Sequence, residues 1–455
     1  MKNKLFGTDG IRGIAGTYPL TESLVYAVGF HAGAFLKSHS SDSASSIIIG
    51  RDTRESGSWI TDRLAEGLTA SGMHVCDAGV ITTPGISYLV QKEHHAAGAV
   101  ISASHNPAEY NGIKFFSSNG TKLDDAIEAR IEHEIVTKKA PNSSAVHVAK
   151  TGHNTGTAEY IDFLCSTFPA GRNLNGMKIV IDCAHGAGYY IGPEVLSKLG
   201  AEVIPIFVKP DGFNLNKNCG SQHPAVLQET VKRNNADCGF ALDGDADRVI
   251  FTDAGGSAFD GDHVLALLAV YLKDKGLLTG NILVTTIMAN LGLVRAMEAR
   301  GIKVIQTAVG DRYVYESMIQ HHAVLGGEQS GHIIIRDRVK TGDGMVTALA
   351  VLGVMVKTGK TLAELTGIMK KYPQILLNIP VTDKLPIDKI SGFTALENKF
   401  ISELGLDGRI VTRYSGTEHC LRIMIEGIDF EDIKNKAESL AHIVEKKIGQ
   451  KKAVQ

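Results

Sequence analysis

Residues 98–107 read Gly-Ala-Val-Ile-Ser-Ala-Ser-His-Asn-Pro, an apolar run that breaks off into a polar turn. The apolar part is typical of a buried strand, and Asn106-Pro107 ends it. Ser104 therefore follows the end of a strand, with His105 beside it. Such a position exposes a hydroxyl as a nucleophile, although serine needs a nearby base or metal ion to react. By itself the stretch leaves a plain polar turn open as the alternative.

A second apolar run, residues 238–242, ends in Asp243-Gly244-Asp245-Ala246-Asp247-Arg248. Alternating carboxylates in an extended loop can converge on a hard cation, and Mg²⁺ suits ligands that are all oxygen. An EF-hand is excluded, because its sixth and twelfth positions would be Gly and Glu and here are Arg248 and Ala254. The remaining alternative is an acidic surface turn.

Two further polar loops follow apolar runs. Residues 326–332 (Gly-Gly-Glu-Gln-Ser-Gly-His) offer groups that suit sugar hydroxyls, with a core role for His332 as the alternative. Residues 413–418 (Arg-Tyr-Ser-Gly-Thr-Glu) combine a guanidinium with hydroxyls and a glycine, which favours phosphate binding. The glycine-rich turn at residues 186–192 has its third glycine one residue late for a dinucleotide fingerprint, so we expect no nucleotide cofactor.

Short β-branched runs alternate with helix-length amphipathic segments, the pattern of α/β units with mostly parallel sheets. The 455 residues exceed one core, and breaks in composition divide them into domains at 1–151, 152–252, 253–370 and 371–455. We expect three mixed or parallel-sheet α/β domains plus a C-terminal α+β domain around a central cleft. After Tyr372-Pro373 the predicted order is helix, strand, loop, strand, helix. Ligands gather at the carboxyl ends of parallel strands, so the four loops are expected to meet.

The composition limits the partners. A formal net charge of −2 gives no chain-wide attraction to nucleic acid or to anionic membranes. Six cysteines without CxxC spacing indicate free thiols in a reducing compartment. The first residues lack an apolar signal core, and no apolar stretch reaches the ~18 residues of a spanning helix. We expect a cytoplasmic protein, monomer or homodimer, with neither nucleic acid nor membrane as partner.

The four loops in this order resemble the α-D-phosphohexomutase superfamily, whose members carry a phosphoserine, a metal, a sugar and a phosphate loop. The resemblance covers nearly the whole chain, and its matching stretches include residues 6–13, 50–54, 102–107, 111–116, 309–314 and 327–332. Gln329 and Gly310-Asp311-Arg312 are similar to the bacterial phosphoglucosamine mutases within that superfamily. His419-Cys420 departs from the pattern, which usually has proline after the phosphate-loop Glu, and residues 338–340 (Arg-Val-Lys) replace a more polar stretch.

The resemblance implies an isomerase that interconverts glucosamine 6-phosphate and glucosamine 1-phosphate, in the pathway to amino-sugar nucleotides and cell-wall precursors. A phosphoserine at Ser104, a hexosamine bisphosphate intermediate and one Mg²⁺ per active site belong to that expectation. A phosphomannomutase or phosphoglucomutase of the same superfamily is the alternative. The implied catalytic residues are Ser104, His105, Lys114, Arg12 and Arg248, and the metal ligands are Ser104, Asp243, Asp245 and Asp247. The implied substrate-binding residues are Glu328, Ser330, His332, Asp311, Arg312, Arg413, Ser415, Gly416 and Thr417.

Two other classes of protein compete with this interpretation. A metal-dependent serine phosphatase would use the same nucleophile and cation but pass the phosphoryl group to water. A catalytically idle sugar-phosphate sensor would need damage in a reactive loop, and neither the Ser104 segment nor residues 243–247 show any.

Overall fold

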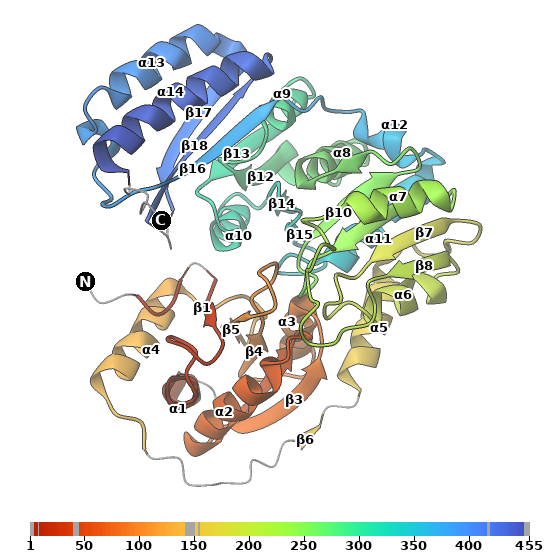
Figure 1. Cartoon of the computed structure of the whole chain (residues 1–455). Helices are drawn as coiled ribbons and strands as arrows, with labels where there is room; N and C mark the ends of the chain where they lie inside the picture. The colour runs from red at the N-terminus through yellow and green to blue at the C-terminus, as the bar shows by residue number, and fades with distance from the viewer. Residues whose placement is uncertain are drawn as a thin grey trace.

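The computed structural model describes residues 4–7, 9–39, 45–141, 151–152, 155–415 and 419–449. In this described part the strands form four sheets that follow one another along the chain. Figure 1 shows the N-terminal sheet at the bottom of the view, the two middle sheets above and to its right, and the C-terminal module, in blue, at the top. Three sheets contain parallel pairs and the fourth is antiparallel, so the predicted fold class is confirmed.

The N-terminal sheet has the order β1-β5-β4-β2-β3-β6. Its central strands pair in parallel, whereas β5 runs antiparallel to both β4 and β1. The strands are β1 (Ile11–Ile14), β2 (Ser46–Arg51), β3 (His74–Val80), β4 (Ala97–Ile101), β5 (Tyr110–Ser117) and β6 (Thr151–Gly152). The helices are α1 (Glu22–His39), α2 (Gly57–Ala70), α3 (Thr83–Lys92) and α4 (Asp125–Thr137). The β4–β5 hairpin therefore carries the Ser104 loop at its turn.

The second sheet has the order β11-β10-β9-β7-β8, and the third β13-β12-β14-β15. The second is built from β7 (Lys178–Asp182), β8 (Glu202–Ile206), β9 (Cys238–Leu242), β10 (Val249–Asp253) and β11 (Ala258–Phe259), with α5 (Gly156–Thr167), α6 (Ile191–Lys198) and α7 (Ala225–Arg233). The third is built from β12 (Ile282–Thr286), β13 (Lys303–Thr307), β14 (Leu325–Gly327) and β15 (Ile333–Ile335), with α8 (Gly261–Asp274), the 3₁₀ turn η1 (Thr279–Asn281), α9 (Leu291–Glu298), α10 (Asp311–Gln320), α11 (Gly344–Thr358) and α12 (Leu362–Thr366). The acidic loop, residues 243–248, is the turn of the antiparallel β9–β10 pair. Residues 326–332, named the sugar loop after the role expected from the resemblance, join β14 to β15.

The C-terminal module is an antiparallel sheet in the order β16-β18-β17, covered by helices on one face (Figure 1). It consists of β16 (Gln374–Pro380), the 3₁₀ turns η2 (Ile387–Lys389) and η3 (Gly405–Asp407), α13 (Phe393–Leu404), β17 (Gly408–Tyr414), β18 (Cys420–Gly427) and α14 (Phe430–Ile448). The order predicted from the sequence is wrong because it omits β16. This strand pairs with β18 over its whole length, and only Ile375, Leu377 and Ile379 face the core, so its apolar signal is short and ends at a proline.

The apolar cores are distributed unevenly. One cluster joins residues from all three α/β domains, including Ile86, Ile181 and Leu283. A second packs the N-terminal sheet against α1 and α2. The C-terminal module has a cluster whose members all lie between Ile375 and Ile448. The first three domains thus share apolar contacts, and the fourth has its own core.

Among the described residues, the structure has no helix with the length and apolar content needed to cross a membrane.

Candidate active site

Ser104 follows β4 in a loop with an unusual backbone. Its φ of 52° lies in the left-handed region, which costs a non-glycine residue about 1 kcal/mol or more and persists only where surrounding contacts hold it. The Ser104 amide donates to Ser102 Oγ at 2.9 Å, and Ser102 Oγ in turn donates to Asp52 Oδ2 at 2.6 Å. The Ser104 carbonyl accepts from the Asn216 amide at 2.9 Å. Ser104, the predicted nucleophile, is therefore held through both its backbone amide and its backbone carbonyl.

Arg54 holds the same loop through hydrogen bonds from its buried guanidinium group. Its guanidinium pairs with Asp52 at 2.9 Å, and both side chains are fully buried. It also donates to the carbonyl oxygens of Ser104 at 3.0 Å, Asn106 at 2.8 Å and Tyr110 at 2.8 Å, and to that of Pro107. We assigned no role to Arg54 from the sequence. The only available signal was the Asp-x-Arg pattern that directly follows β2.

The hydroxyl of Ser104 points at the acidic loop. Ser104 Oγ donates to Asp243 Oδ2 at 2.6 Å, and His105 Nδ1 lies 3.4 Å from the same hydroxyl oxygen. Burial, and after it the charges of Asp247 and Asp245, raise the pKa of Asp243 well above its usual value. The two loops, 139 residues apart in the sequence, thus meet at the predicted nucleophile.

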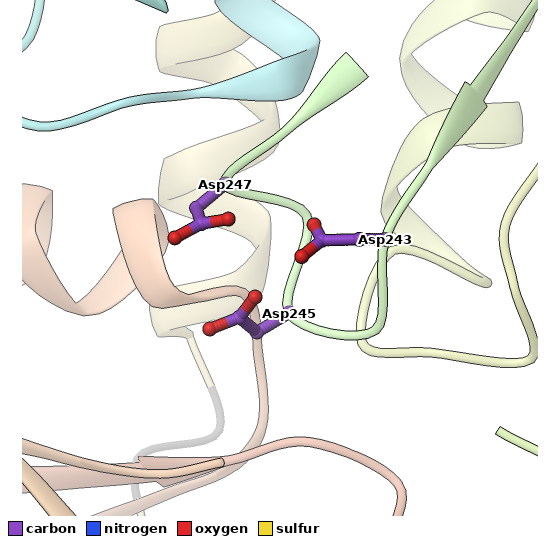
Figure 2. A group of neighbouring side chains, drawn as sticks. All are labelled: Asp243, Asp245 and Asp247. Carbon is purple, nitrogen blue, oxygen red and sulfur yellow. The ribbon is translucent and has the colours of Figure 1, made fainter. Parts of the chain in front are cut away.

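The three carboxylates of the acidic loop converge, as Figure 2 shows. One carboxylate oxygen from each of Asp243, Asp245 and Asp247 lies within 4.8 Å of the others, and all three residues are buried. Asp245 Oδ1 and Asp247 Oδ1 are buried without a hydrogen-bond partner. Buried carboxylates are costly unless they are paired or bind a cation, so these orphaned oxygens fit a divalent metal ion with oxygen ligands. The triplet can hold a metal.

Glycines let the acidic loop lie close to its neighbours. A Cβ at Gly244 would lie 2.7 Å from the Ser104 carbonyl oxygen, and one at Gly186 would lie 2.3 Å from the Gly244 oxygen. The Ala187 amide donates to that Gly244 oxygen at 2.8 Å. The glycine-rich turn at residues 186–192 therefore packs directly against the backbone of the acidic loop.

Lys114, on β5, lies between two carboxylates. Its ammonium group is 3.0 Å from Asp245 Oδ2 and 3.2 Å from Asp9 Oδ2. Burial lowers the pKa of Lys114, but the charges of Asp245 and Asp9 outweigh this effect and hold it above its usual value. Arg12 and Lys122 pair with Asp9 as well, so Asp9 gathers three cations at the edge of the site. We assigned no role to Asp9 or Lys122 from the sequence.

Two other predicted catalytic residues flank the acidic loop. Burial, and then the charges of Arg248 and Arg12, lower the pKa of His105 to about 4, so its ring is neutral at pH 7. Arg248 stays charged, because the carboxylates around it, Asp247 first, outweigh the effect of burial and raise its pKa.

The predicted residues of the sugar loop differ in exposure: Glu328 and Ser330 are accessible to solvent, whereas His332 is buried. Glu328 is partly exposed and accepts from the Gly310 amide at 3.2 Å, and Ser330 is exposed. His332 is buried: its Nδ1 lies 3.4 Å from Asp247 Oδ2, and its Nε2 lies 3.6 Å from Asp311 Oδ2 and accepts from the Gly342 amide at 3.0 Å. Its contacts connect the sugar loop to the acidic loop.

Asp311 and Arg312 face the N-terminal domain. Asp311 pairs with Lys122 at 2.5 Å. Arg312 pairs with Glu128 at 3.1 Å and with Asp125, both on α4. These contacts join the third domain to the first.

Two arginines lie beside each other at the phosphate loop (residues 413–418), one in the loop and one on β18. Arg413 on β17 stands directly opposite Arg422 on β18. Burial, and then the charge of Arg422, lower the pKa of Arg413, and its Nε is buried without a hydrogen-bond partner. Two neighbouring guanidinium groups favour an anion between them. Arg422 has no local signal in the sequence, since only the strand register reveals it.

Of the remaining predicted residues of the phosphate loop, Ser415 lies within the described part of the chain. Ser415 is buried, and its carbonyl accepts from Lys384 Nζ at 2.6 Å. Gly416 and Thr417 lie outside the described residues.

Family models match four consecutive parts of the chain. They are described as phosphoglucomutase/phosphomannomutase alpha/beta/alpha domain I for residues 3–142, domain II for residues 158–256, domain III for residues 260–372, and the C-terminal domain for residues 376–443. The phosphoglucosamine mutase of Geobacter metallireducens is 48% identical over 451 residues, which cover 98% of this chain and 100% of that protein.

Two solved structures share the fold. A phosphoglucomutase/phosphomannomutase family protein from Burkholderia thailandensis has a TM-score of 0.79 at 22% identity, with 97% of each chain covered. The N-acetylphosphoglucosamine mutase of Aspergillus fumigatus, in complex with GlcNAc-6P and magnesium, has a TM-score of 0.70 at 18% identity and covers 99% of this chain and 96% of its own.

Proposed function

Since the chain belongs to the phosphoglucomutase/phosphomannomutase family, with a phosphoglucosamine mutase among its full-length relatives, we propose that it interconverts glucosamine 6-phosphate and glucosamine 1-phosphate. The resemblance stated from the sequence is thereby confirmed. The observation that carries the proposed chemistry is the 2.6 Å hydrogen bond from Ser104 Oγ to Asp243, inside a buried triplet of carboxylates.

The proposed reaction has two half-reactions. In the first, the bond between phosphorus and the Ser104 oxygen breaks and phosphorus bonds to the free hydroxyl oxygen of the sugar, which loses its proton, while the Ser104 oxygen takes one up. The product is a hexosamine bisphosphate, which must turn around in the cleft. In the second, its other phosphoryl group returns to the Ser104 oxygen, which loses its proton, and the sugar oxygen regains one. One Mg²⁺ held by Asp243, Asp245, Asp247 and an oxygen of the phosphoserine would supply positive charge that offsets the charge of the transferring group.

Lys114 is our candidate for the proton transfers. Because its pKa is raised, it enters the cycle as an ammonium group, which stabilises the phosphoryl oxygens and can supply the proton of the second half-reaction. In the first, it would give a proton to the Ser104 oxygen as the bond to phosphorus breaks and take up the proton of the sugar hydroxyl, so it ends that half-reaction as an ammonium group, paired with Asp245 at 3.0 Å. Arg12, Arg248 and His105 are proposed as electrostatic support, and His105 gains a charge only once the phosphate anion raises its lowered pKa.

The proposed substrate contacts come from two loops. Glu328 and Ser330 offer a carboxylate and a hydroxyl to the sugar ring, and their partial exposure supports that role. Arg413 and Ser415 would anchor the phosphate that is not reacting, together with Gly416 and Thr417. His332, Asp311 and Arg312 contribute to substrate binding indirectly in our proposal, because they hold loops of the site in place. The contacts of Arg312 with α4 support this indirect role.

The proposal also covers the domain boundaries, the location in the cell and the partners. We keep the domain boundaries 1–151, 152–252, 253–370 and 371–455, because each range contains most strands of one sheet, although β6 spans the first boundary and β11 of the second sheet lies in the third range. A cytoplasmic location is supported by six cysteines that are all free thiols. We propose a monomer or homodimer whose partner is the sugar phosphate, with no role for nucleic acid or membrane.

The decisive experiment compares initial rates on the 6-phosphates of glucosamine, glucose and mannose, each with a bisphosphate primer. We expect the amino sugar to be fastest. Equal rates would remove the preference for it, and faster glucose or mannose turnover would favour a phosphoglucomutase or phosphomannomutase. Inorganic phosphate released at the rate of turnover would instead indicate a phosphatase.

A second experiment tests the nucleophile. Ser104→Ala should abolish turnover and keep the native fold, because Ser104 lies outside the apolar clusters; its lost hydrogen bond to Asp243 should cost only about 1–3 kcal/mol. Substantial mutase activity in this variant would refute the phosphoserine.

A further inference from the structure

The junction between the third and fourth domains is polar. The apolar cluster of the α/β domains ends at Met369, and that of the C-terminal module begins at Ile375. The linker between them is held by specific hydrogen bonds. Asn290 Oδ1 accepts from the Tyr372 amide at 2.9 Å, and Asn290 Nδ2 donates to the Tyr372 carbonyl at 3.1 Å. One side chain of the third domain thus binds both backbone groups of a linker residue.

Asn290 also reaches the last domain directly. Its Nδ2 donates at 3.0 Å to Glu426 on β18, whose carboxylate is fully buried. Glu426 accepts further bonds from the Leu291 amide at 3.1 Å, Arg409 Nε at 2.6 Å and Gln374 Nε2 at 3.1 Å. The orientation of the C-terminal module, and with it the position of Arg413, therefore depends on where Asn290 and the start of α9 are placed.

Asp262, in the first turn of α8, connects this junction to the sugar loop. Its buried Oδ2 accepts from the Asn290 amide at 2.8 Å and from Gln329 Nε2 at 3.0 Å. The sugar loop also touches the residue before it, since the Gly261 amide donates to the Gln329 carbonyl at 3.0 Å. A Cβ at Gly261 would lie 2.1 Å from the Glu328 carbonyl oxygen, so the contact is tight.

The residue on the other side of Gly261 holds the linker itself. Asp260 caps α8 and pairs with Lys371, which precedes Tyr372. The tripeptide Asp260-Gly261-Asp262 therefore contacts the sugar loop and the interdomain linker at once. Asp262 Oδ1 has no hydrogen-bond partner, so all of the described hydrogen bonding of this carboxyl serves the two segments that it joins.

We propose that Asp262 is a positioning residue that couples the sugar loop to the seating of the C-terminal domain, and that Gln329 acts through Asp262. The inference rests on the proposed mutase function. When the sugar hydroxyls order the loop around Glu328, the Gln329 amide and the Gly261 contact hold Asp262 in place. Asp262 then fixes the Asn290 amide, and Asn290 fixes Tyr372 and Glu426. Arg413 and Arg422 are thereby held in the position where they bind the phosphate that is not reacting.

The atoms involved distinguish two substitutions at this position. Asparagine can place its amide oxygen where Oδ2 lies and keep both acceptor bonds, and its NH₂ group would occupy the place of Oδ1, which has no partner. Alanine removes the acceptor from both segments. A coupling role therefore predicts rescue by Asp262→Asn.

The test is steady-state kinetics with glucosamine 6-phosphate, combined with measurement of free glucosamine bisphosphate released per turnover. Asp262→Ala should raise KM about tenfold, the loss expected for one buried hydrogen bond, and should raise bisphosphate release while kcat changes less. Asp262→Asn should stay within about threefold of wild type. Asp274→Ala, at the exposed far end of α8, is the matched control and should match wild type in all three measurements.

A double-mutant cycle with Gln329→Leu separates coupling from general destabilisation. Gln329→Leu alone should reproduce the rise in KM, and combining it with Asp262→Ala should add little further. Additive effects, or unchanged KM and bisphosphate release in either single variant of an active enzyme, would overturn the coupling. If Asp262→Ala does not fold, Gln329→Leu alone decides, since it alters a partly exposed loop residue. Absence of mutase activity in the wild type would refute the proposed function instead, so the two failures are distinguishable.

Discussion

Replacement of Arg54 by methionine should unfold the N-terminal domain far more easily while keeping most of the side-chain volume. The guanidinium is the buried cation partner of Asp52 and the donor to four carbonyl oxygens of the Ser104 loop. Breaking a buried ion pair by removing one partner costs about 3–5 kcal/mol, because the other charge stays buried and unpaired. With a urea m value of ~2 kcal/mol/M, the unfolding midpoint should fall by about 1.5–2.5 M.

The fluorescent probe and the control substitution both lie close to Arg54 in the sequence. Trp59, the single tryptophan, is on α2 in the N-terminal domain, so its fluorescence follows this domain in urea. Arg51→Met is the matched control: Arg51 pairs with Asp77 at 3.1 Å, but its side chain is 23% exposed, so its loss should cost at most ~1 kcal/mol. Equal midpoint shifts for Arg54→Met and Arg51→Met would refute the reasoning.

The Arg54 variant should also lose turnover under conditions where it remains folded. The left-handed backbone of Ser104 persists because its carbonyl and amide are both held, and Arg54 is one of the donors. A displacement of the nucleophile by about 1 Å is sufficient to cost ~10²-fold in rate. A folded Arg54→Met protein with wild-type kcat would show that the loop keeps its geometry without the guanidinium.

Three further predictions follow from single contacts. Gly244→Ala should lower kcat at least tenfold with little loss of stability, because its Cβ would lie 2.7 Å from the Ser104 carbonyl oxygen; Gly255→Ala, whose Cβ comes no closer than 3.3 Å to another atom, should be silent, and equal kcat values in the two variants would contradict this. Burial raises the pKa of Asp182 to about 7, so the folded state binds this proton more tightly than the unfolded chain. As the pH rises from ~4 to 7, the wild type should therefore lose about 1.4 kcal/mol of stability per pH unit relative to Asp182→Asn. A difference in unfolding free energy between the two proteins that does not change with pH would show that Asp182 is not protonated in the folded state. Chelation with EDTA should abolish turnover reversibly on return of Mg²⁺, whereas an unaffected rate would remove the metal from the mechanism.

The sequence revealed the chemistry wherever reactive side chains follow an apolar strand. Ser104 and Asp243 lie just after β4 and β9, so the rule that ligands gather at the carboxyl ends of strands was enough to predict their meeting. The same rule located Glu328 after β14. These residues have a local signal because the strand, the break and the polar group are adjacent in the chain.

Residues whose partners lie far along the chain had no such signal. Arg54 contacts carbonyls about 50 residues away, Arg422 faces Arg413 through strand register, and Lys122 meets Asp9 across 113 residues. A polar residue in a loop or strand is ordinary in sequence, and only tertiary contacts give it a function. For the same reason the sequence could not tell that His332 and Arg312 turn toward other domains.

The glycines show where the two kinds of information coincide. The turn at residues 186–192 was rejected as a nucleotide-binding fingerprint, and the structure shows that Gly186 lies against the Gly244 oxygen instead. A glycine in such a turn thus indicates that another group packs closely against its Cα, but the sequence does not identify that group. Gly244 lies within the acidic motif and also against the Ser104 carbonyl, so its local pattern and its long-range contact concern the same atoms. Substitution there should disturb the chemistry more than the fold, because the contact positions the two reactive loops and lies outside the apolar cores.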